Sequence, residues 1–385
     1  MPQKIFIPKT KYRAMIIGGG ASGLCAAVSY LAAGGKELLL IEALDELGKK
    51  ILATGNGRCN LTNVHADGYA DTIALFSSLG VPLRADAEGR AYPMSNRAAS
   101  VRDAFVERLK TAVRAGLCEV LAGRRVSGIV REASAISVSF ENGASLEAEK
   151  VLIATGGKAG PQYGSFGDGF AFARSLGQEL SRIRPSLVQL VYSEGEKAKF
   201  TSLDGARAKA NAKLTVSRET AATASGEILF RKDCLSGIMA FDLSCAWPMP
   251  GDEGEVAVVI DLAPALSEGE LVHTLKNSGA LGLRGVLDER IAAFIECEAK
   301  GDDRAAAAIV KAFEVPVSGT KGWREAQVTK GGVALPGIRE DTGESVRIPG
   351  LYFAGEVLNR DFVCGGYNLD HAWNSGRRAG IAMAK

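Results

Sequence analysis

One short segment constrains the fold of this chain more than any other. An apolar run, Ala14 to Ile17, leads directly into Gly18-Gly19-Gly20-Ala21-Ser22-Gly23, which has the pattern GxGxxG. The stretch that follows, Leu24 to Ala33, is rich in the helix-forming residues alanine and leucine. Strand, glycine turn and helix therefore come in the order that a dinucleotide-binding βαβ unit requires.

Each glycine of this pattern has its own physical role. Gly18 permits the tight turn, Gly20 lets the backbone approach a pyrophosphate, and Gly23 brings the helix close to the strand. The pyrophosphate would then lie at the positive end of the helix. The residues that we expect to contact it are Gly18, Gly20, Ala21, Ser22 and Gly23.

An acidic residue follows the next predicted strand. That strand, Leu38 to Ile41, ends in Glu42, nineteen residues after Gly23. A carboxylate at this position can accept hydrogen bonds from both ribose hydroxyls of an adenosine, and it repels a 2′-phosphate. FAD or NAD is therefore favoured over NADP. A plain glycine-rich turn in a parallel sheet would explain the glycines but not Glu42.

Two later segments favour FAD over NAD. Val151 to Gly157 predicts a buried strand that ends in a glycine turn, after a small antiparallel meander that starts at Val126. Pro349 to Glu356 predicts another strand, ending in a glycine and an acid. Together they resemble the FAD-binding fold of the glutathione reductase type. In that fold the first turn lies by the cofactor, and the acid contacts its ribityl or pyrophosphate part.

The last motif, Cys364 to Asn368, places two glycines directly before a predicted helix that continues past Gly376. Backbone N–H groups at this helix start would face the negative charge that flavin reduction places at N1 and the C2 carbonyl. An ordinary helix start is the alternative. The position directly after the strand that ends in Gly355-Glu356 favours the flavin interpretation.

Between these motifs lies Gly48 to Asn63, whose centre reads Gly55-Asn56-Gly57-Arg58-Cys59-Asn60. This segment resembles the diagnostic region of a bacterial family of FAD-dependent enzymes, the BaiN-like and aminoacetone-oxidase-like flavoproteins. Further matches follow in chain order: Gly89 to Ser95, Gly167 to Gly169, Gly226 to Phe230, Val328 to Val333 and Gly365 to Gly380. The resemblance therefore spans essentially the whole chain.

The resemblance implies an α/β protein. Its glutathione-reductase-type Rossmann FAD-binding domain would carry an inserted β-rich domain and a small helical subdomain. On this sequence the discontinuous FAD-binding domain covers residues 1–190 and 320–385, the β-rich insert 191–263 and the helical insert 264–319. Loops 231–237, 341–345 and 359–362 depart from the family pattern, so no member's substrate can be carried over.

The motifs and the resemblance together predict one set of residues that holds FAD without a covalent bond. By resemblance, Asn56 to Asn60 passes close to the isoalloxazine and Asp168 faces the cofactor. The full predicted set is Gly18, Gly20, Ala21, Ser22, Gly23, Glu42, Lys50, Asn56, Gly57, Arg58, Cys59, Asn60, Val126, Thr155, Gly156, Gly157, Asp168, Gly355, Glu356, Gly366, Tyr367 and Asn368.

Three members of this set are candidates for chemistry beside the ring. Arg58 could polarise a substrate carbonyl or carboxylate, or bind a cofactor phosphate. Cys59 is favoured as a small buried hydrophobe, because no partner cysteine stands near it in a CxxC pair. Tyr367 could donate to a substrate or pack on the ring. At His371 we expect a hydrogen-bonded core or surface histidine, and we assign no catalytic base.

Composition excludes several other classes of protein. The seven cysteines form no CxxC pair and the three histidines lie far apart, so we expect neither a disulfide framework nor a metal site. A net charge of +2 gives no reason to expect nucleic acid or a membrane surface as partner. No apolar run approaches the roughly 18 residues of a membrane span, and none follows residues 1–11, so we expect a cytoplasmic protein.

The sequence therefore predicts an FAD-dependent oxidoreductase that acts on a small organic molecule by hydride transfer at flavin N5. NAD(P)H could bind transiently over the flavin, since no second GxGxxG unit is present. The main alternative is a non-catalytic flavin-binding redox sensor or interaction protein. A flavoenzyme acting on RNA is a further option, against which the near-neutral charge counts. The oligomeric state stays open.

Overall fold

The computed structural model describes residues 9–248 and 254–385. Most of the N-terminal segment 1–11, considered above as a possible targeting segment, lies outside the described residues. The chain forms two compact units, one of residues 1–184 and 328–385 and one of residues 185–327. The first unit is discontinuous because the second is inserted into it. Two short strands, β10 (Arg184–Ser186) and β17 (Val328–Lys330), lie where the chain passes from one unit to the other.

A seven-stranded mixed sheet forms the centre of the first unit. Strands β6, β2, β1, β9 and β18 run parallel, and β9, β8 and β7 continue the sheet as an antiparallel meander. Strand β18 comes from the end of the chain and pairs with β9, which confirms the Rossmann-type fold and its returning strand. The bounds are β6 (Cys118–Leu121), β2 (Leu38–Ile41), β1 (Lys11–Ile17), β9 (Ser145–Ile153), β8 (Ile136–Phe140), β7 (Val126–Arg131) and β18 (Leu351–Phe353).

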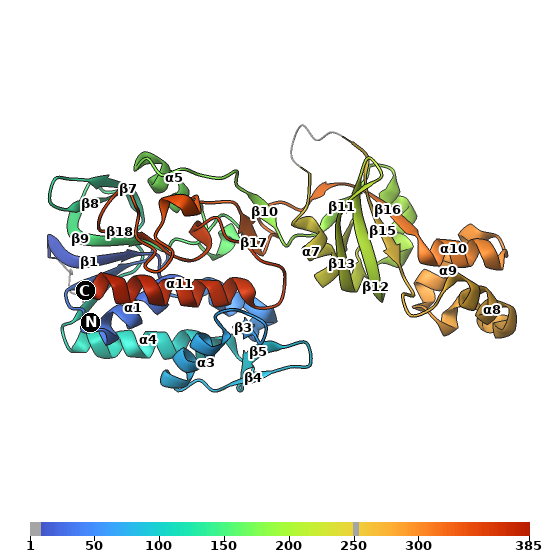
Figure 1. Cartoon of the computed structure of the whole chain (residues 1–385), viewed down its shortest axis with the longest axis horizontal. Helices are drawn as coiled ribbons and strands as arrows, with labels where there is room; N and C mark the ends of the chain where they lie inside the picture. Colours follow the sequence, from blue (N-terminus) through green and yellow to red (C-terminus); the bar gives the residue numbers. More distant parts are fainter. Residues whose placement is uncertain (1–8, 249–253) are drawn as a thin grey trace. The chain divides into compact units, whose positions relative to one another are not determined.

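Helices α1 (Ala21–Ala32), α4 (Ala98–Arg114) and α11 (Tyr367–Ala384) lie together on one face of this sheet (Figure 1). Trp373 of α11 stacks on Phe105 of α4, with ring centroids 5.5 Å apart, and buries this layer. On the other face of the sheet, apolar side chains of the meander and of the short helix α5 pack with Met15, Ile17, Leu39 and Ile41 of β1 and β2. The remaining elements of the unit are α5 (Asp168–Ser175), α2 (Lys49–Ala53), α3 (Tyr69–Ser78), β3 (Thr62–Asn63), β4 (Leu83–Ala85) and β5 (Arg90–Pro93).

Helices α1 and α11 approach each other closely because glycines face the contact. A Cβ at Gly376 would lie 2.3 Å from the carbonyl oxygen of Ser22, and one at Gly380 would lie 2.2 Å from that of Ala26. Only residues without a Cβ allow backbones to come this near. This contact fixes the C-terminal helix beside the first βαβ unit.

The second unit is a closed barrel with the strand order β11-β14-β13-β12-β15-β16. Helices α8 to α10 precede β16 in the chain, and β16 is the strand that closes the barrel. The predicted helical insert, residues 264–319, was therefore wrong at its end, because most of β16 falls within it. Phe313, Val315 and Val317 point into the barrel core, a two-residue alternation typical of a strand. The bounds are β11 (Leu190–Tyr192), β12 (Arg207–Val216), β13 (Glu219–Phe230), β14 (Cys234–Ser236), β15 (Val256–Asp261), β16 (Phe313–Thr320), α6 (Glu196–Phe200), α7 (Ile238–Ser244), α8 (Glu268–Ser278), α9 (Glu289–Ala299) and α10 (Asp303–Lys311).

Among the described residues, none of the helices combines the length and the apolar character that a membrane crossing needs.

Candidate flavin site

The glycine loop after β1 has the geometry that its three glycines suggest. Gly18 has φ +107°, and a Cβ there would lie 2.4 Å from the carbonyl oxygen of Ala154. A Cβ at Gly23 would lie 1.8 Å from the carbonyl oxygen of Gly18. A Cβ at Gly20, in contrast, would meet no atom within 4 Å. Two of the glycines therefore allow close protein contacts, and the third borders open space.

That open space lies at the N-terminus of α1. Gly20 is the N-cap, and no side chain caps the helix. The Ser22 hydroxyl donates instead to the carbonyl oxygen of Ala354, at 3.3 Å. The first N–H groups of a helix have no partner within the helix, so those of α1 are left for an anion at its positive end.

Glu42 holds the loop from the end of β2. Its Oε2 accepts a hydrogen bond from the backbone N–H of Gly19 at 2.7 Å, and its Oε1 accepts one from Leu44 at 2.8 Å. Burial raises the pKa of this carboxyl group above its usual value. Each oxygen of a carboxylate can accept more than one hydrogen bond, so both keep the capacity to accept a ribose hydroxyl.

A small cavity brings five of the predicted residues together: Gly18, Glu42, Val126, Thr155 and Asp168. Sequence reasoning missed other residues that line it. Arg124 and Arg125 stand directly before β7, where no pattern distinguishes them from exposed basic residues. The rest of the lining is Ile17, Ile41, Ala43, Gly164, Phe166 and Phe172.

Asp168 is bound by a neighbour that the sequence did not indicate. Arg125 donates to both carboxylate oxygens of Asp168, at 2.9 and 2.7 Å, and its guanidinium lies 4.9 Å from the ring centre of Phe166. The bidentate pair fixes Arg125 at the mouth of the cavity. Asp168 thus holds the Arg125 cation there, near the ring of Phe166.

A second cluster joins Lys50 to Glu356, 306 residues apart in the chain. Lys50 Nζ donates to Glu356 Oε2 at 2.8 Å and to the carbonyl oxygen of Ala159 at 3.0 Å. Glu356 Oε1 accepts from the backbone N–H of Thr329 at 2.8 Å. A Cβ at Gly157 would lie 2.2 Å from the Thr329 hydroxyl oxygen, which explains a glycine at this turn.

Thr329 is a positioning residue to which the sequence assigned no role. Its hydroxyl oxygen accepts from the backbone N–H groups of Lys158 and Ala159, at 2.7 and 3.0 Å. The turn after β9 is thereby tied to β17. Thr329 lies in the segment Val328 to Val333, which resembles the family, and this was the signal in the sequence that could have indicated a role. Its partner amides could not be inferred, because they lie about 170 residues away in the chain.

The segment from Gly55 to Asn60 forms a tight, partly left-handed loop. Positive φ angles occur at Gly55, Asn56, Gly57 and Cys59. The exposed Arg58 lies with its guanidinium carbon 4.8 Å from the ring centre of the buried Tyr92. Cys59 is fully buried, and burial raises its pKa to about 12. A thiol of this kind is not a nucleophile near neutral pH, as expected for a small buried hydrophobe.

Helix α11 begins beside this loop. The Asn60 side-chain amide makes two hydrogen bonds when it is oriented so that both its nitrogen and its oxygen have partners. Its nitrogen donates to the carbonyl oxygen of Thr62, and its oxygen accepts from the backbone N–H of Gly366, each at 3.1 Å. Asn63 donates to the carbonyl oxygen of Gly365 at 3.1 Å. The half-buried Tyr367 is the first helical residue, and no side chain caps the helix.

Two further contacts fix the start of α11. Asn368 pairs with the backbone of Phe362, donating at 2.9 Å and accepting at 3.1 Å. The buried carboxylate of Asp370 accepts from the hydroxyls of Thr62 and Thr72, at 2.6 and 2.7 Å. Sequence reasoning missed Asp370, since nothing near it in the chain marks its partners.

His371 differs from the expectation. It is buried as predicted for a core histidine, but its Nε2 has no hydrogen-bond partner among the described residues. Burial lowers its pKa to about 4. The neutral ring is therefore the form present at physiological pH.

The predicted residues fall into three groups within the first unit. One surrounds the α1 N-terminus and Glu42, one joins Lys50 to Glu356 and Gly157, and one places the 55–60 loop against the start of α11. Uncapped helix N-termini, open space at Gly20 and a carboxylate beside it fit an adenine dinucleotide.

The sequence profile of the HI0933-like protein Rossmann domain matches residues 12–69 and 68–382, nearly the whole chain. The chain belongs to the HI0933-like family. The 3-dehydro-bile acid delta(4,6)-reductase of Clostridium scindens is 33% identical to it, over 96% of this chain and 98% of the relative. The ribosomal RNA dihydrouridine synthase of Escherichia coli is 27% identical, over 95% and 96%.

Solved structures show the same fold for this HI0933-like protein. The 3-ketosteroid delta1-dehydrogenase of Sterolibacterium denitrificans matches with a TM-score of 0.53 and 12% identity, over 98% of this chain and 100% of that chain. The 3-ketosteroid-delta4-(5alpha)-dehydrogenase of Rhodococcus jostii RHA1 matches with a TM-score of 0.51 and 16% identity, over 99% and 98%. Family membership, with a reductase related over the full length, makes the chain a flavin-dependent oxidoreductase.

Proposed function

We propose that this protein holds FAD without a covalent bond and reduces a carbon–carbon double bond conjugated to a carbonyl group in a small organic molecule. The observation that carries the cofactor part is the open space at Gly20, beside the uncapped N-terminus of α1 and the Glu42 carboxylate. The names of two relatives support the substrate class. A 3-dehydro-bile acid with delta(4,6) unsaturation and a uridine each carry a double bond conjugated to a carbonyl.

The chain's own residues would hold the cofactor in three places. Glu42 accepts the ribose hydroxyls, and the N-terminus of α1 faces the pyrophosphate. The ion pair of Lys50 and Glu356 fixes the turn at Gly157 along the path between the two ends. The 55–60 loop and the start of α11 are proposed to receive the ring.

When bound, the flavin supplies a hydride at N5, and a proton completes the reduction on the other carbon. Arg58 is the candidate for polarising the substrate carbonyl, since its exposed guanidinium is held over the ring of Tyr92. The uncapped start of α11 stabilises negative charge near it. Cys59 takes no part in our proposal, because its thiol is buried and its pKa is raised.

We further propose a small-molecule substrate, with neither nucleic acid nor membrane as partner, and a cytoplasmic location. The net charge of +2 and seven free cysteines support this proposal. The RNA alternative has one specific observation in its favour, the two relatives named as ribosomal RNA dihydrouridine synthases at 27% and 26% identity. NAD(P)H, bound transiently, is the proposed source of electrons.

The test starts from the purified holoprotein, whose flavin is identified by mass spectrometry of a denatured extract. The flavin is reduced anaerobically with NADH, NADPH or dithionite, and its reoxidation is followed by stopped flow. We expect rapid reoxidation by a steroid 4-en-3-one or a smaller cyclic enone, and slow reoxidation by a ribosomal RNA fragment. Rapid reoxidation by the RNA alone would favour the second candidate. A reduced flavin inert to all of these acceptors would contradict the enzymatic proposal.

An Arg58→Met variant tests the assigned residue. We expect its flavin content to stay near that of the parent protein and the rate of enone reduction to fall by about tenfold to a hundredfold, because a charged hydrogen-bond donor to the developing enolate is lost. Arg84→Met, an exposed arginine on β4, serves as the control with the same change of charge. Loss of flavin from Arg58→Met would instead assign the residue to cofactor binding.

A further inference from the structure

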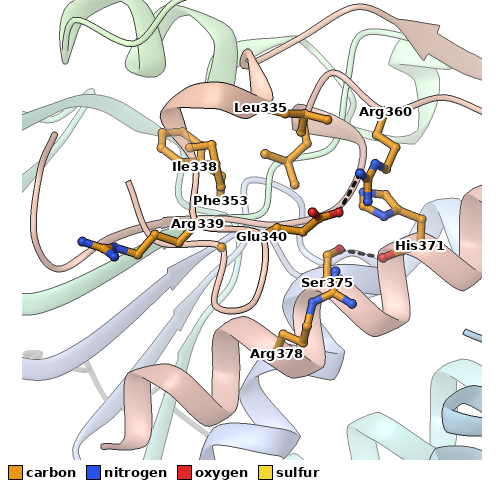
Figure 2. A pocket seen from close by; sticks show the side chains of 11 residues that line it. Leu335, Ile338, Arg339, Glu340, Phe353, Arg360, His371, Ser375 and Arg378 are labelled. Atoms are coloured by element: carbon orange, nitrogen blue, oxygen red, sulfur yellow. Dashed lines mark hydrogen bonds and ion pairs between the residues drawn. The ribbon is translucent and has the colours of Figure 1, made fainter. Parts of the chain in front are cut away.

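A second cavity lies in the first unit beside β18, the strand that pairs with β9 (Figure 2). Its walls come from the 335–343 segment, from the residues just after β18 and from α11. None of the residues predicted to bind FAD lines it. The cavity is therefore separate from the predicted FAD-binding residues, although Ser375 and His371 of its lining are hydrogen-bonded to the backbone of Gly355.

Cationic and polar side chains occupy one side of this cavity. Figure 2 shows Arg360 beside His371, with Glu340 reaching toward Arg360 and Arg378 rising from the next turn of α11 near Ser375. Glu340 Oε1 accepts from Arg360 Nη2 at 2.8 Å. Arg339 also lines the cavity, but its side chain points away and lies 3.9 Å from Glu344.

Two buried nitrogen atoms on this side have no hydrogen-bond partner among the residues that the structure describes, Nε2 of His371 and Nε of Arg378. Buried polar atoms in native proteins are nearly always hydrogen-bonded, and an exception calls for an explanation. His371 is only 9% exposed, and it contacts the backbone of Gly355 through a hydrogen bond. Both orphaned atoms lie on residues that line the same cavity.

The charges around the cavity do not balance. Arg360 and Arg378 carry two positive charges toward it, and Glu340 supplies a single negative charge from its exposed position. Burial and the neighbouring Arg360 lower the pKa of Arg378. One further negative charge inside the cavity would neutralise the excess and give Arg378 a partner.

The opposite side of the cavity is apolar. Leu335, Ile338, Phe353 and Leu358 line it, and Ile338, Phe353 and Leu358 are buried. An inorganic anion would leave the remaining exposed surface of Leu335 and Ile338 without contact, whereas a molecule with an apolar body would cover it. The lining thus combines an anion-binding side with a hydrophobic side.

We propose that this cavity binds a small organic carboxylate, with its carboxylate on Arg378 and on the protonated ring of His371 and its apolar body on Leu335 and Ile338. Because the neutral imidazole has Nε2 free and its other nitrogen engaged at Gly355, the bound carboxylate favours protonation of His371. Affinity therefore rises as pH falls from 7 to 5, toward the pKa of about 4 of the free imidazole. The groups that face His371 are Arg378 on its own helix, Arg360 and Phe362 after β18, and Glu340 from the 335–343 segment.

The first test measures binding of benzoate to the flavin-loaded protein by isothermal titration calorimetry. We expect Arg378→Met to weaken binding at least about tenfold, since it removes a charged partner. Arg377→Met is the matched control, because Arg377 pairs with Asp71 at 3.2 Å and does not line the cavity, so its affinity should stay within about twofold. Equal affinity in the parent protein and Arg378→Met would overturn the proposal.

Thermal unfolding separates a binding role from a structural one. Without benzoate, Arg378→Met should unfold at the same temperature as the parent protein or higher, because a half-buried charge whose Nε has no partner is replaced by an apolar side chain. With benzoate, only the parent protein and Arg377→Met should gain stability. A large loss of stability in Arg378→Met without ligand would mean that the arginine is structural.

Location and chemistry are checked with two further probes. Crystals grown with 4-bromobenzoate should show anomalous bromine signal beside Leu335 and Ile338, and signal elsewhere would place the site outside this cavity. Inorganic phosphate should bind more weakly than benzoate, and the reverse order would overturn the assignment of an organic ligand. Affinity for benzoate that does not change between pH 7 and pH 5 would exclude His371 from the site. These measurements require no turnover, so they are independent of the proposed reaction.

Discussion

Two glycines in the first unit illustrate opposite uses of a missing side chain. At Gly20, a Cβ would meet no atom within 4 Å, and the φ angle of −81° is ordinary for any residue. At Gly376, a Cβ would lie 2.3 Å from the carbonyl oxygen of Ser22. The first glycine leaves room that the protein itself does not fill. The second allows α11 to lie against α1.

The difference separates ligand binding from folding. A side chain added at Gly20 should leave the fold intact and take the place of a ligand. A side chain added at Gly376 must move a helix. Both positions lie at helices that we assign to the flavin site, so the comparison also distinguishes the residues that contact the cofactor from those that hold the framework.

The largest expected effect is the loss of flavin binding when Gly20 is replaced. Gly20→Val should abolish flavin binding, so the purified variant should be colourless, because the branched side chain fills the space at the N-terminus of α1. Its circular dichroism spectrum should match that of the flavin-free parent protein. Gly23→Ala, whose Cβ would lie 1.8 Å from a carbonyl oxygen, should fail to fold instead. A yellow Gly20→Val protein would remove the basis of the proposed pyrophosphate position.

Replacement of Gly376, where α11 packs against α1, should lower the stability of the fold. Gly376→Ala should lower the free energy of unfolding by about 1–3 kcal/mol, although alanine is favoured over glycine within a helix by about 1 kcal/mol. Gly269→Ala in α8 is the control, because a Cβ there meets no atom within 4 Å, and it should be neutral or stabilising. Urea unfolding of both variants measures the difference. Equal stability of the two variants would contradict the close contact of α1 and α11.

His371 extends the comparison to the side of α11 that faces the cavity. Its pKa is lowered to about 4 in the folded protein, against about 6.5 in an unfolded chain. As pH falls from 7.5 to 5, the unfolded chain therefore takes up a proton that the folded chain does not, and the folded state loses about 2 kcal/mol. His371→Gln should lose this part of the acid sensitivity, measured by urea unfolding at both pH values without added carboxylates. His65→Asn, at an exposed histidine, should retain it.

The smallest effect concerns the ion pair of Lys50 and Glu356, which belongs to the second of the three groups of predicted cofactor residues. Lys50 and Glu356 are 26% and 20% exposed, so their coupling should be about 1 kcal/mol in a double-mutant cycle of Lys50→Met and Glu356→Gln. Unfolding of the flavin-free protein measures this coupling. A coupling near zero would mean that the pair positions Glu356 without stabilising the fold.

The sequence predicted the local parts of the site better than the distant ones. The loop from Gly18 to Gly23 was predicted together with its strand and helix, because the physical reasons for its glycines lie within one βαβ unit. The bond between Thr329 and the turn after β9 was not predicted, since its partners lie far away in the chain. Arg125 was missed for the same reason, because only the fold brings it to Asp168.

By itself, the sequence determined the Rossmann-type unit, the position of Glu42 and the family, because these depend on short-range order along the chain and on recurring motifs. The tertiary structure alone decided which face of α11 closes against α1 and which side chains it presents to a cavity. Burial is the physical reason: the same helix segment carries His371, whose Nε2 is left without a partner, and Gly376, which touches a backbone. Neither environment is encoded within the neighbouring residues, because each is created by segments that fold against the helix from elsewhere in the chain.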